Sequence, residues 1–395
     1  MTSRMQWTAT RASMARATLW LLATALLSSA ALAGPREQAQ RIHDRLAGVP
    51  PTEEVLTDMA NLLPGNALAA ALIATDNKHF YTVTLKNFAA PWTNRDQSAF
   101  VPLNDYITLV IGLVKDDEPF NQVLFGDVLY TGVGVSPAPA ATSNAHFEAL
   151  EARMLDATFD PTTEIQRTAQ SSVYGLPSTA TAGAMTTRAA AEAFFIAGTN
   201  RAMFRFTLMN HMCMDLEQVH DTSIVPDRIR QDVSRSPGGD SRVFLNNCIG
   251  CHAGMDPLAQ AFAHYNFDDV AGRIVYDESA VHSKYFNNDE TFADGFVTPD
   301  DSWSNYWRQG QNALIGWESS LPGSGSGAKS LGQELAGSQA FAHCQAEKVF
   351  ENVCLRSPVD AADRAQVDAM ALSFRNNNYD LRRVFAESAA YCMGN

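Results

Sequence analysis

Two cysteines and a histidine stand within five residues of one another, at Cys248, Cys251 and His252, in the order Cys-Ile-Gly-Cys-His. On a helix, positions i, i+3 and i+4 share one face, so the three side chains would point the same way. Two thiols on that face can add to the two vinyl groups of a haem, and the imidazole then lies under the iron. The pattern therefore predicts one covalent haem c, with thioethers at Cys248 and Cys251 and with His252 as the proximal axial ligand.

The same Cys-x-x-Cys spacing also occurs in redox-active dithiols and in one half of a zinc site. A dithiol of the thioredoxin type needs a strand before the motif and a helix that begins at the first cysteine. The preceding segment, residues 243–247, is too short to decide this point. A zinc site needs a second ligand pair, and Cys344 and Cys354 lack the spacing for one. The leader sequence described below favours haem, because c-type haem is attached outside the cytoplasm.

The second axial ligand of the iron is harder to place, because the chain lacks a methionine at the usual distance downstream. Met255 follows His252 by three residues and is on the wrong side of the ring to coordinate, so we expect it to pack against the haem edge. No methionine occurs between residues 256 and 369. The other candidates are His264, His282 and His343 after the motif and His211, Met212 and Met214 before it.

Among these candidates we favour His282, which lies in a loop that could fold over the distal face of the haem. His264 is the second candidate. It lies on a helix that we expect to begin at Asp256 and Pro257, a cap followed by a first-turn proline, and such a helix would pack near the haem. A single histidine there can equally be structural, and an open sixth coordination site remains an alternative.

The first 33 residues have the three parts of a Sec-type signal peptide. A basic start with three arginines precedes the apolar run Leu19–Leu27, and Ala31–Ala33 forms a cleavage site of the A-x-A type. The apolar run is too short to span a bilayer, and no later segment has about 18 consecutive apolar residues. We therefore expect a soluble, periplasmic or secreted protein that is cleaved near Ala33 and has no transmembrane segment.

The mature chain is strongly acidic. The formal net charge of the whole chain is −14, and removal of the three leader arginines lowers it by three, to −17. A surface of this sign repels phosphate backbones, so we expect no nucleic-acid partner. It would suit a redox protein with a basic docking face, although solubility alone also accounts for such a charge.

The four cysteines outside the haem motif form an even set in a chain that we expect to be exported to an oxidising compartment. The tail is predicted to form three helices in an up-down-up order, so its first and third helices run parallel. Cys354 and Cys392 then fall at the same end of the bundle and suit a disulfide. Cys344 is left to tie the tail back to Cys213.

Hydrophobic periodicity predicts a mainly α, multi-region protein with a c-type haem domain and a C-terminal three-helix unit. A short strand-like run at Phe80–Leu85 stands apart from this pattern, and Gly323–Gly327 is a Gly/Ser run typical of flexible linkers. Helices are predicted at residues 35–63, 66–76, 104–114, 145–155, 186–197, 201–216, 338–352, 361–375 and 380–391. The expected regions are a signal peptide (1–33), an N-terminal helical region (34–145), the haem domain (146–300), a Gly/Ser-rich linker (301–335) and a C-terminal helical unit (336–395).

The haem segment resembles that of the planctomycete-type cytochrome c proteins, which carry C-x-x-C-H-x-x-I-D-P-x-G-F followed by E-N-F-D and G-R. This chain has Cys248–Leu258, then Phe262, Asn266–Asp268 and Gly272–Arg273, with Met255 in place of the isoleucine, Ala259–Gln260 in place of the glycine and His264 near the position of the glutamate. Shorter blocks that are similar to the family's are Leu46–Thr52, Asp117–Asp127, Gly183–Thr186 with Thr199–Arg201, and Cys344–Tyr391. The resemblance implies a haem, export and a mostly helical fold, and it implies no substrate.

These features favour an exported monohaem c-type cytochrome that carries electrons to or from an extracytoplasmic redox partner. A haem enzyme of peroxidase or oxidase type, with an open iron site, is the alternative, because roughly 200 residues before the haem exceed what a carrier needs. A third reading is a non-catalytic module that senses redox state or a small gas. High-spin iron that binds carbon monoxide or peroxide would contradict the simple carrier.

Overall fold

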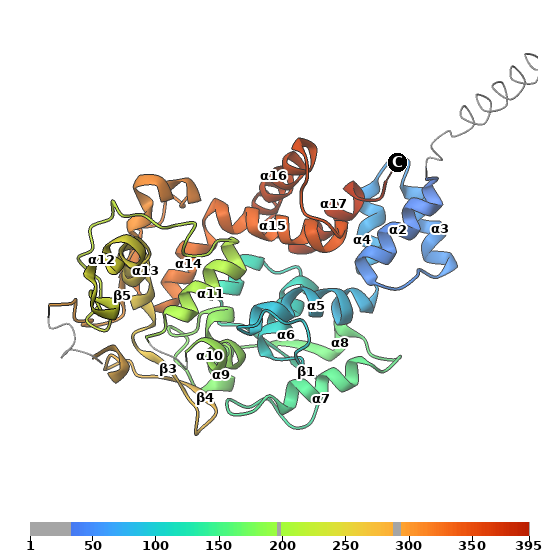
Figure 1. Cartoon of the computed structure of the whole chain (residues 1–395). Helices are drawn as coiled ribbons and strands as arrows, with labels where there is room; N and C mark the ends of the chain where they lie inside the picture. Colours follow the sequence, from blue (N-terminus) through green and yellow to red (C-terminus); the bar gives the residue numbers. More distant parts are fainter. Residues whose placement is uncertain (1–32, 196–198, 287–293, 395) are drawn as a thin grey trace, which may run out of the picture.

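The computed structural model describes residues 33–195, 199–286 and 294–394, and within them helices dominate (Figure 1). The leader predicted at residues 1–33 therefore lies outside the described residues except for its last position. The strands form small antiparallel pairs: β1 (Leu129–Gly132) with β2 (Ile165–Thr168), β3 (Tyr265–Asp268) with β4 (Arg273–Tyr276), and β5 (Ser302–Ser304) with β6 (Ser324–Ser326). The prediction of a mainly α protein is confirmed. Across the described ranges, no helix has both the length and the apolar character needed to cross a membrane.

The described chain opens with the helices α2 (Pro35–Ala47), α3 (Glu53–Leu62) and α4 (Ala67–Thr75). Each boundary has a local cause. Gly48 adopts a φ of 70° and ends α2, as glycine does at many helix C-termini. The Thr52 hydroxyl caps α3 by accepting from the N–H of Val55, and Asn66 caps α4 in the same way. The ranges 35–63 and 66–76 are helical as predicted, except that the first range holds two helices, α2 and α3, with residues 48–52 between them.

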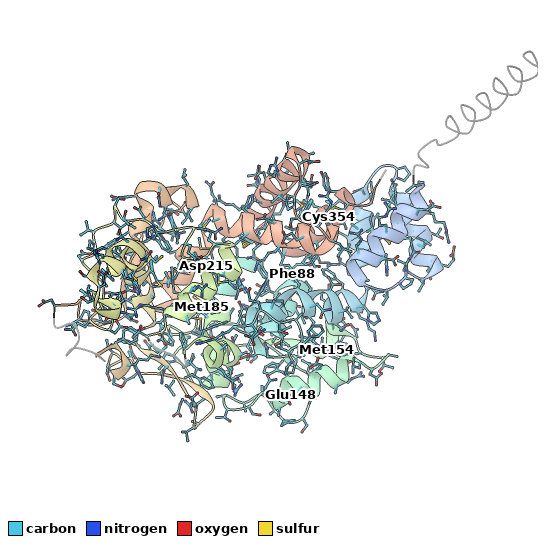
Figure 2. The ribbon with its side chains drawn as sticks, in the orientation of Figure 1. Phe88, Glu148, Met154, Met185, Asp215 and Cys354 are labelled. Carbon is cyan, nitrogen blue, oxygen red and sulfur yellow. A yellow bond between two sulfur atoms is a disulfide. The ribbon has the colours of Figure 1, made fainter. Side chains whose placement is uncertain are left out.

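The strand-like run Phe80–Leu85 is a π-helix, η1, which continues into α5 (Lys86–Ala89) and η2 (Ala90–Thr93). Tertiary packing explains the difference from the strand-like pattern. The rings of Phe80 and Phe88 both pack edge-on against Phe385 of the C-terminal region, each with ring centroids 5.2 Å apart. Phe88 is labelled in Figure 2, below the C-terminal helices. A helical backbone brings both rings to the same partner.

The centre of the molecule is built around α6 (Asp105–Lys115), in which every residue except Lys115 is buried. Asn104 caps this helix by accepting from the N–H groups of Tyr106 and Ile107. The elements that follow are η3 (Phe120–Leu124), α7 (Ala145–Met154), α8 (Pro161–Glu164), α9 (Gln170–Tyr174), η4 (Gly183–Thr186), α10 (Arg188–Phe194) and α11 (Arg201–Met212). Helices are thus present in each region between 104 and 216 where the periodicity predicts one.

The chain ends in α14 (Gly327–Ala336), α15 (Gln339–Cys354), α16 (Ala361–Asn376) and α17 (Leu381–Tyr391), and the last three match the predicted tail helices. The last helix meets the first described helices, because α17 packs on α4 and α2 (Figure 1). Arg382 of α17 donates from Nε to the Thr75 hydroxyl at 2.8 Å, and Arg45 of α2 donates to the Val353 carbonyl at 2.6 Å. The tail helices are therefore packed against the N-terminal helices.

The Gly/Ser run expected to be a flexible linker is instead part of a packed structure. Ser324–Ser326 forms β6, which pairs with β5. The chain between the two strands forms η9 (Tyr306–Arg308) and η10 (Gly310–Ile315). The Trp303 ring, which is 2 % exposed, donates from Nε1 to the Ser330 hydroxyl at 2.8 Å. A Cβ on Gly325 would lie 3.0 Å from that ring. The small residues therefore let an aromatic ring approach the backbone closely, which composition alone does not reveal.

Both disulfides inferred from the helix order are confirmed. Cys213 pairs with Cys344, with a Cα–Cα distance of 5.2 Å, and Cys354 pairs with Cys392 at 5.5 Å. The first joins the C-terminal end of α11 to α15, and the second joins the ends of α15 and α17. Cys248 and Cys251 remain as free thiols.

A partly buried lysine beside the first disulfide predicts a pH-dependent stability. The Lys348 ammonium donates to the Asn210 carbonyl at 2.7 Å and lies 4.6 Å above the Trp92 ring. Burial lowers the pKa of Lys348 to about 7, against about 10.4 in an unfolded chain. Between these values the unfolded chain binds a proton that the folded protein does not, so stability rises with pH, by at most about 1.4 kcal/mol per pH unit.

Lys348→Met is expected to flatten this rise between about pH 7 and 10. Urea unfolding at several pH values across that window measures the difference in slope between the native chain and the variant. Lys78→Met, which removes a lysine that donates to the backbone carbonyls of Asp156 and Ala157, is the control and should leave the slope unchanged. Parallel curves for the native chain and Lys348→Met would contradict the prediction.

Candidate functional site

The Cys-x-x-Cys-His motif lies on a continuous helical segment at the end of the molecule opposite α3 (Figure 1). This segment consists of α12 (Ser241–Val243), the π-helix η6 (Phe244–Cys248) and α13 (Ile249–Ala259), and it follows the short turn η5 (Pro237–Gly239). Asp240 begins it by accepting from the N–H of Arg242. Cys248, Cys251 and His252 therefore share one helical face, as predicted, and all three are half-buried.

The motif helix continues through Pro257, whereas the sequence predicted that a new helix begins at Asp256 and Pro257. Pro257 lies inside α13, which ends two residues later at Ala259 and passes into η7 (Gln260–Phe262). The Asp256 carboxylate does not cap a helix, because it makes hydrogen bonds with the side chains of Arg201 and His252. Met255 is 3 % exposed and belongs to the main hydrophobic core.

The surroundings of the two thiols do not resemble those of a redox-active dithiol. Helical residues, not a strand, precede Cys248, so the first cysteine is not at the free N-terminus of a helix. Cys251 is close to the Leu216 carbonyl, with Sγ and O 3.4 Å apart. Burial, with a contribution from Glu217, raises the pKa of the Cys251 thiol, whereas reactive cysteines have a lowered one.

A chelating zinc site finds no support either. Across the residues that the structure describes, no three His, Cys, Asp or Glu side chains gather in a way that could hold a metal ion. The other four cysteines are in disulfides and cannot act as thiolate ligands. Haem c needs less from the chain, because two thioether bonds and one imidazole suffice to hold it.

His252 is oriented by a carboxylate one helical turn later. Its Nδ1 lies 3.2 Å from Oδ1 of Asp256, and Nε2 has no hydrogen bond to any described residue. The Asp256 side chain is fully buried and accepts from Nε and Nη2 of Arg201 at 2.7 and 2.9 Å. Attraction to Arg201 and the bond from His252 together outweigh desolvation and hold the pKa of Asp256 well below its usual range.

The ion pair continues beyond Arg201. Arg201 also donates to both oxygens of Asp232, at 2.5 and 3.0 Å, and to the Thr199 hydroxyl at 2.7 Å. Arg230, which has no exposed surface, lies 4.5 Å above the Tyr285 ring and 3.6 Å from Asp232. We call Asp256, Arg201, Asp232 and Arg230 the charge cluster. Arg201 and Asp256 were part of the family resemblance without a role, and no local pattern points to Asp232 or Arg230.

Two glycines let other elements approach the motif helix. A Cβ on Gly254 would clash with the indole of Trp307, which is fully buried, and a Cβ on Gly250 would clash with the His220 ring. The Gly250 carbonyl also accepts from the N–H of Asp221 at 3.1 Å. These contacts place the helix between η9 on one side and the loop that follows α11 on another.

A cavity of about 490 Å³ is lined by the loop that follows α11 and by the segment of η9 and η10, and residues 248–252 are not among its lining residues. Asp221, Ile224 and Tyr306 are among its lining residues. Ile224 also packs on the small apolar cluster of Ile229, Val233, Phe244 and Ala253, against which Cys248 lies. Ile224 therefore connects the cavity lining to the apolar cluster that packs against Cys248.

The two candidates for the second axial ligand lie near each other, and the segment of His282 reaches the charge cluster through Tyr285, which packs against Arg230. His282 donates its backbone N–H to the Ala263 carbonyl, next to His264, and its Nδ1 accepts from the N–H of Lys284 at 3.3 Å. The His264 Nδ1 lies 3.7 Å from the Asp301 carboxylate. In the described ranges, neither ring forms a hydrogen bond, an ion pair or a ring contact with Cys248 or His252. Which of them faces the iron stays a prediction.

The remaining candidates have structural surroundings. His211 is buried between aromatic rings, and its Nε2 lies 2.6 Å from the Tyr106 hydroxyl. Burial lowers the pKa of His211 well below its usual range, so the ring is neutral. His343 lies on α15, 3.3 Å from Asp368 of α16. Met212 is buried and Met214 packs against the same core.

The site thus consists of two free thiols and an oriented imidazole on one helix, supported by a buried charge cluster. Comparison with models of protein families, with curated proteins and with solved structures finds no match to this chain. What the site can do must therefore follow from its own geometry and chemistry.

Proposed function

We propose that this chain is an exported monohaem c-type cytochrome that carries electrons to or from an extracytoplasmic redox partner. The observation that carries the proposal is the pair of free, half-buried thiols beside an imidazole with an available Nε2. Every other cysteine of the chain is in a disulfide. A chain that forms two disulfides yet keeps a Cys-x-x-Cys pair unpaired suits thiols that become thioethers.

The residues present fit a covalent haem. Cys248 and Cys251 would hold its two vinyl carbons, and His252 would bind the iron through Nε2, because Nδ1 faces Asp256. A cavity lined in part by Ile224, which packs on the same apolar cluster as Cys248, has a volume within the usual range for a cofactor site. When bound, the haem supplies a one-electron couple between ferric and ferrous iron. The chain's own residues set the potential through the axial ligand, burial and nearby charge.

The resemblance to planctomycete-type cytochrome c proteins supports the same proposal from the sequence. The predicted leader and the disulfides support export. The acidic mature chain would favour a partner with a basic docking face, and Asp215 and Glu217 lie near Cys251. Asp215, labelled in Figure 2, also pairs with Arg205 at 2.5 Å, so Glu217 is the freer of the two charges.

One observation favours a second candidate, a haem enzyme with an open iron site. In the described residues neither His264 nor His282 contacts the motif, and Met255 is committed to the core. An iron without a strong distal ligand could bind peroxide or oxygen. The spin state of the iron separates this enzyme from the carrier.

The test is to express the full chain in a host that attaches c-type haem and to purify the exported protein. We expect a mass that equals the chain cleaved near Ala33 plus one haem, retained after denaturation. We also expect low-spin spectra in both oxidation states and oxidation of the ferrous protein by a basic acceptor, slower at high salt. A protein without covalent haem would overturn the proposal. High-spin iron that binds carbon monoxide would replace the carrier with the enzyme.

A further inference from the structure

The hydrogen bond between His252 and Asp256 has a direction. An ionised carboxylate has no proton to donate, so the proton of this bond belongs to Nδ1 of the imidazole. Nε2 then holds the lone pair, and it is free to bind a metal. The i, i+4 spacing places both groups on one face of α13, so the helix itself sets this geometry.

The Asp256 carboxylate, which accepts the bond from His252, also accepts hydrogen bonds from two arginines. Arg201 of α11 donates two hydrogen bonds to Asp256, and the Arg230 backbone N–H adds a third at 3.4 Å. Arg201 is in turn held by Asp232. The Asp256 carboxylate is fully buried and cannot rotate away from the imidazole without breaking these bonds. Water cannot compete for it, which strengthens the interaction.

We propose that Asp256 is a positioning residue. It makes the His252 imidazole a stronger electron-pair donor to the haem iron and so lowers the reduction potential of the haem. The inference rests on the proposed haem function. A carboxylate that accepts from the second ring nitrogen of a metal-bound histidine raises the basicity of the ligand. A more basic ligand favours ferric over ferrous iron. Arg201 is the second positioning residue, because it holds the carboxylate in place.

The formal charge of the charge cluster predicts the same direction of change in the reduction potential. Its two aspartates and two arginines sum to zero. Loss of the Asp256 charge leaves the cluster with one net positive charge near the iron, which also favours the ferrous state. A purely structural role, in which Arg201 and Asp256 join α11 to α13, would need no bond to His252. Removing the Asp256 charge would then shift the potential no more than removing the Asp232 charge from the same cluster.

The experiment compares the midpoint potentials of the native holoprotein, Asp256→Asn and Asp232→Asn. Asparagine at 256 can still accept from Nδ1, but without the negative charge. We expect Asp256→Asn to shift the equilibrium toward ferrous iron by about tenfold, which corresponds to about 59 mV for a one-electron couple. Asp232→Asn makes the same change in charge within the cluster without touching His252, so we expect less than half of that shift. Equal shifts, or no shift in Asp256→Asn, would overturn the role of Asp256.

A measurement on the native protein covers the case in which Asp256→Asn does not fold. With nitrogen-15 in the histidines, the ferrous holoprotein should show His252 with a proton on Nδ1 that exchanges slowly with solvent. Absence of that proton, or its rapid exchange, would overturn the inference. Haem content, measured first, separates the two proposals: a native chain without haem fails the proposed function, whereas an unchanged potential in loaded Asp256→Asn fails only this inference.

Discussion

Replacing Cys248 and Cys251 together with serine is expected to reduce covalently bound haem to background. A serine hydroxyl does not form the thioether that links a cysteine to a haem vinyl group, so no covalent link remains. The two thiols lie half-buried on one helix. Replacing them with serine should therefore leave the hydrophobic cores largely intact. Haem staining after denaturing electrophoresis, with intact mass, measures the loss.

The chain offers a matched control for this result. Replacing Cys354 and Cys392 with serine removes the same number of thiols, but these are joined to each other at the ends of α15 and α17. We expect this variant to retain one covalent haem per folded molecule. Equal loss of haem in both variants would show that the effect comes from impaired folding rather than from loss of the attachment sites.

Removing the Cys213–Cys344 disulfide is expected to cause the larger of two losses of stability. This bond closes a loop with a sequence separation of 131 residues, whereas Cys354–Cys392 closes one of 38. In the chain-entropy treatment, cross-linking lowers the entropy of the unfolded chain by an amount that grows with the logarithm of loop length. That amounts to about 5 kcal/mol for the longer loop and about 4 kcal/mol for the shorter one, near the upper end of what native disulfides contribute.

Alanine pairs at the two bonds allow the comparison, because Cys344 and Cys354 are both buried and lose similar volume. Urea unfolding of the native chain, Cys213→Ala with Cys344→Ala, and Cys354→Ala with Cys392→Ala gives the free energies of unfolding. The longer loop also encloses the motif helix, so we expect its variant to lose haem more readily during export. A loss below about 1 kcal/mol for the longer loop, or the reverse order, would contradict the prediction.

The elements of this protein whose causes are local are the ones that sequence reasoning placed correctly. Thr52 and Asn66 cap α3 and α4, and each accepts from a backbone N–H three residues later. The disulfides also followed from the sequence, because three tail helices in an up-down-up order leave few choices of partner. Pro257 was misread, since a proline near a helix end has the same local pattern as one near a helix start.

The predictions that failed depended on contacts between distant segments. The strand-like run Phe80–Leu85 is helical, and its Phe80 ring packs against Phe385, about 300 residues later in the chain. The Gly/Ser run is structured because Trp303 packs against it. Neither contact has a signature within the segment itself.

The sequence by itself determined that two thiols and an imidazole share one helical face, because the 3.6-residue repeat of the helix converts the spacing at Cys248, Cys251 and His252 into a direction. Only the tertiary structure decided what stands behind the imidazole. The charge cluster joins Asp256 to Arg201, which is 55 residues away, and to Asp232. Buried charges are stable only when opposite charges and donors enclose them. Which charges meet depends on how α11 packs against α13, and no spacing within either helix contains that information.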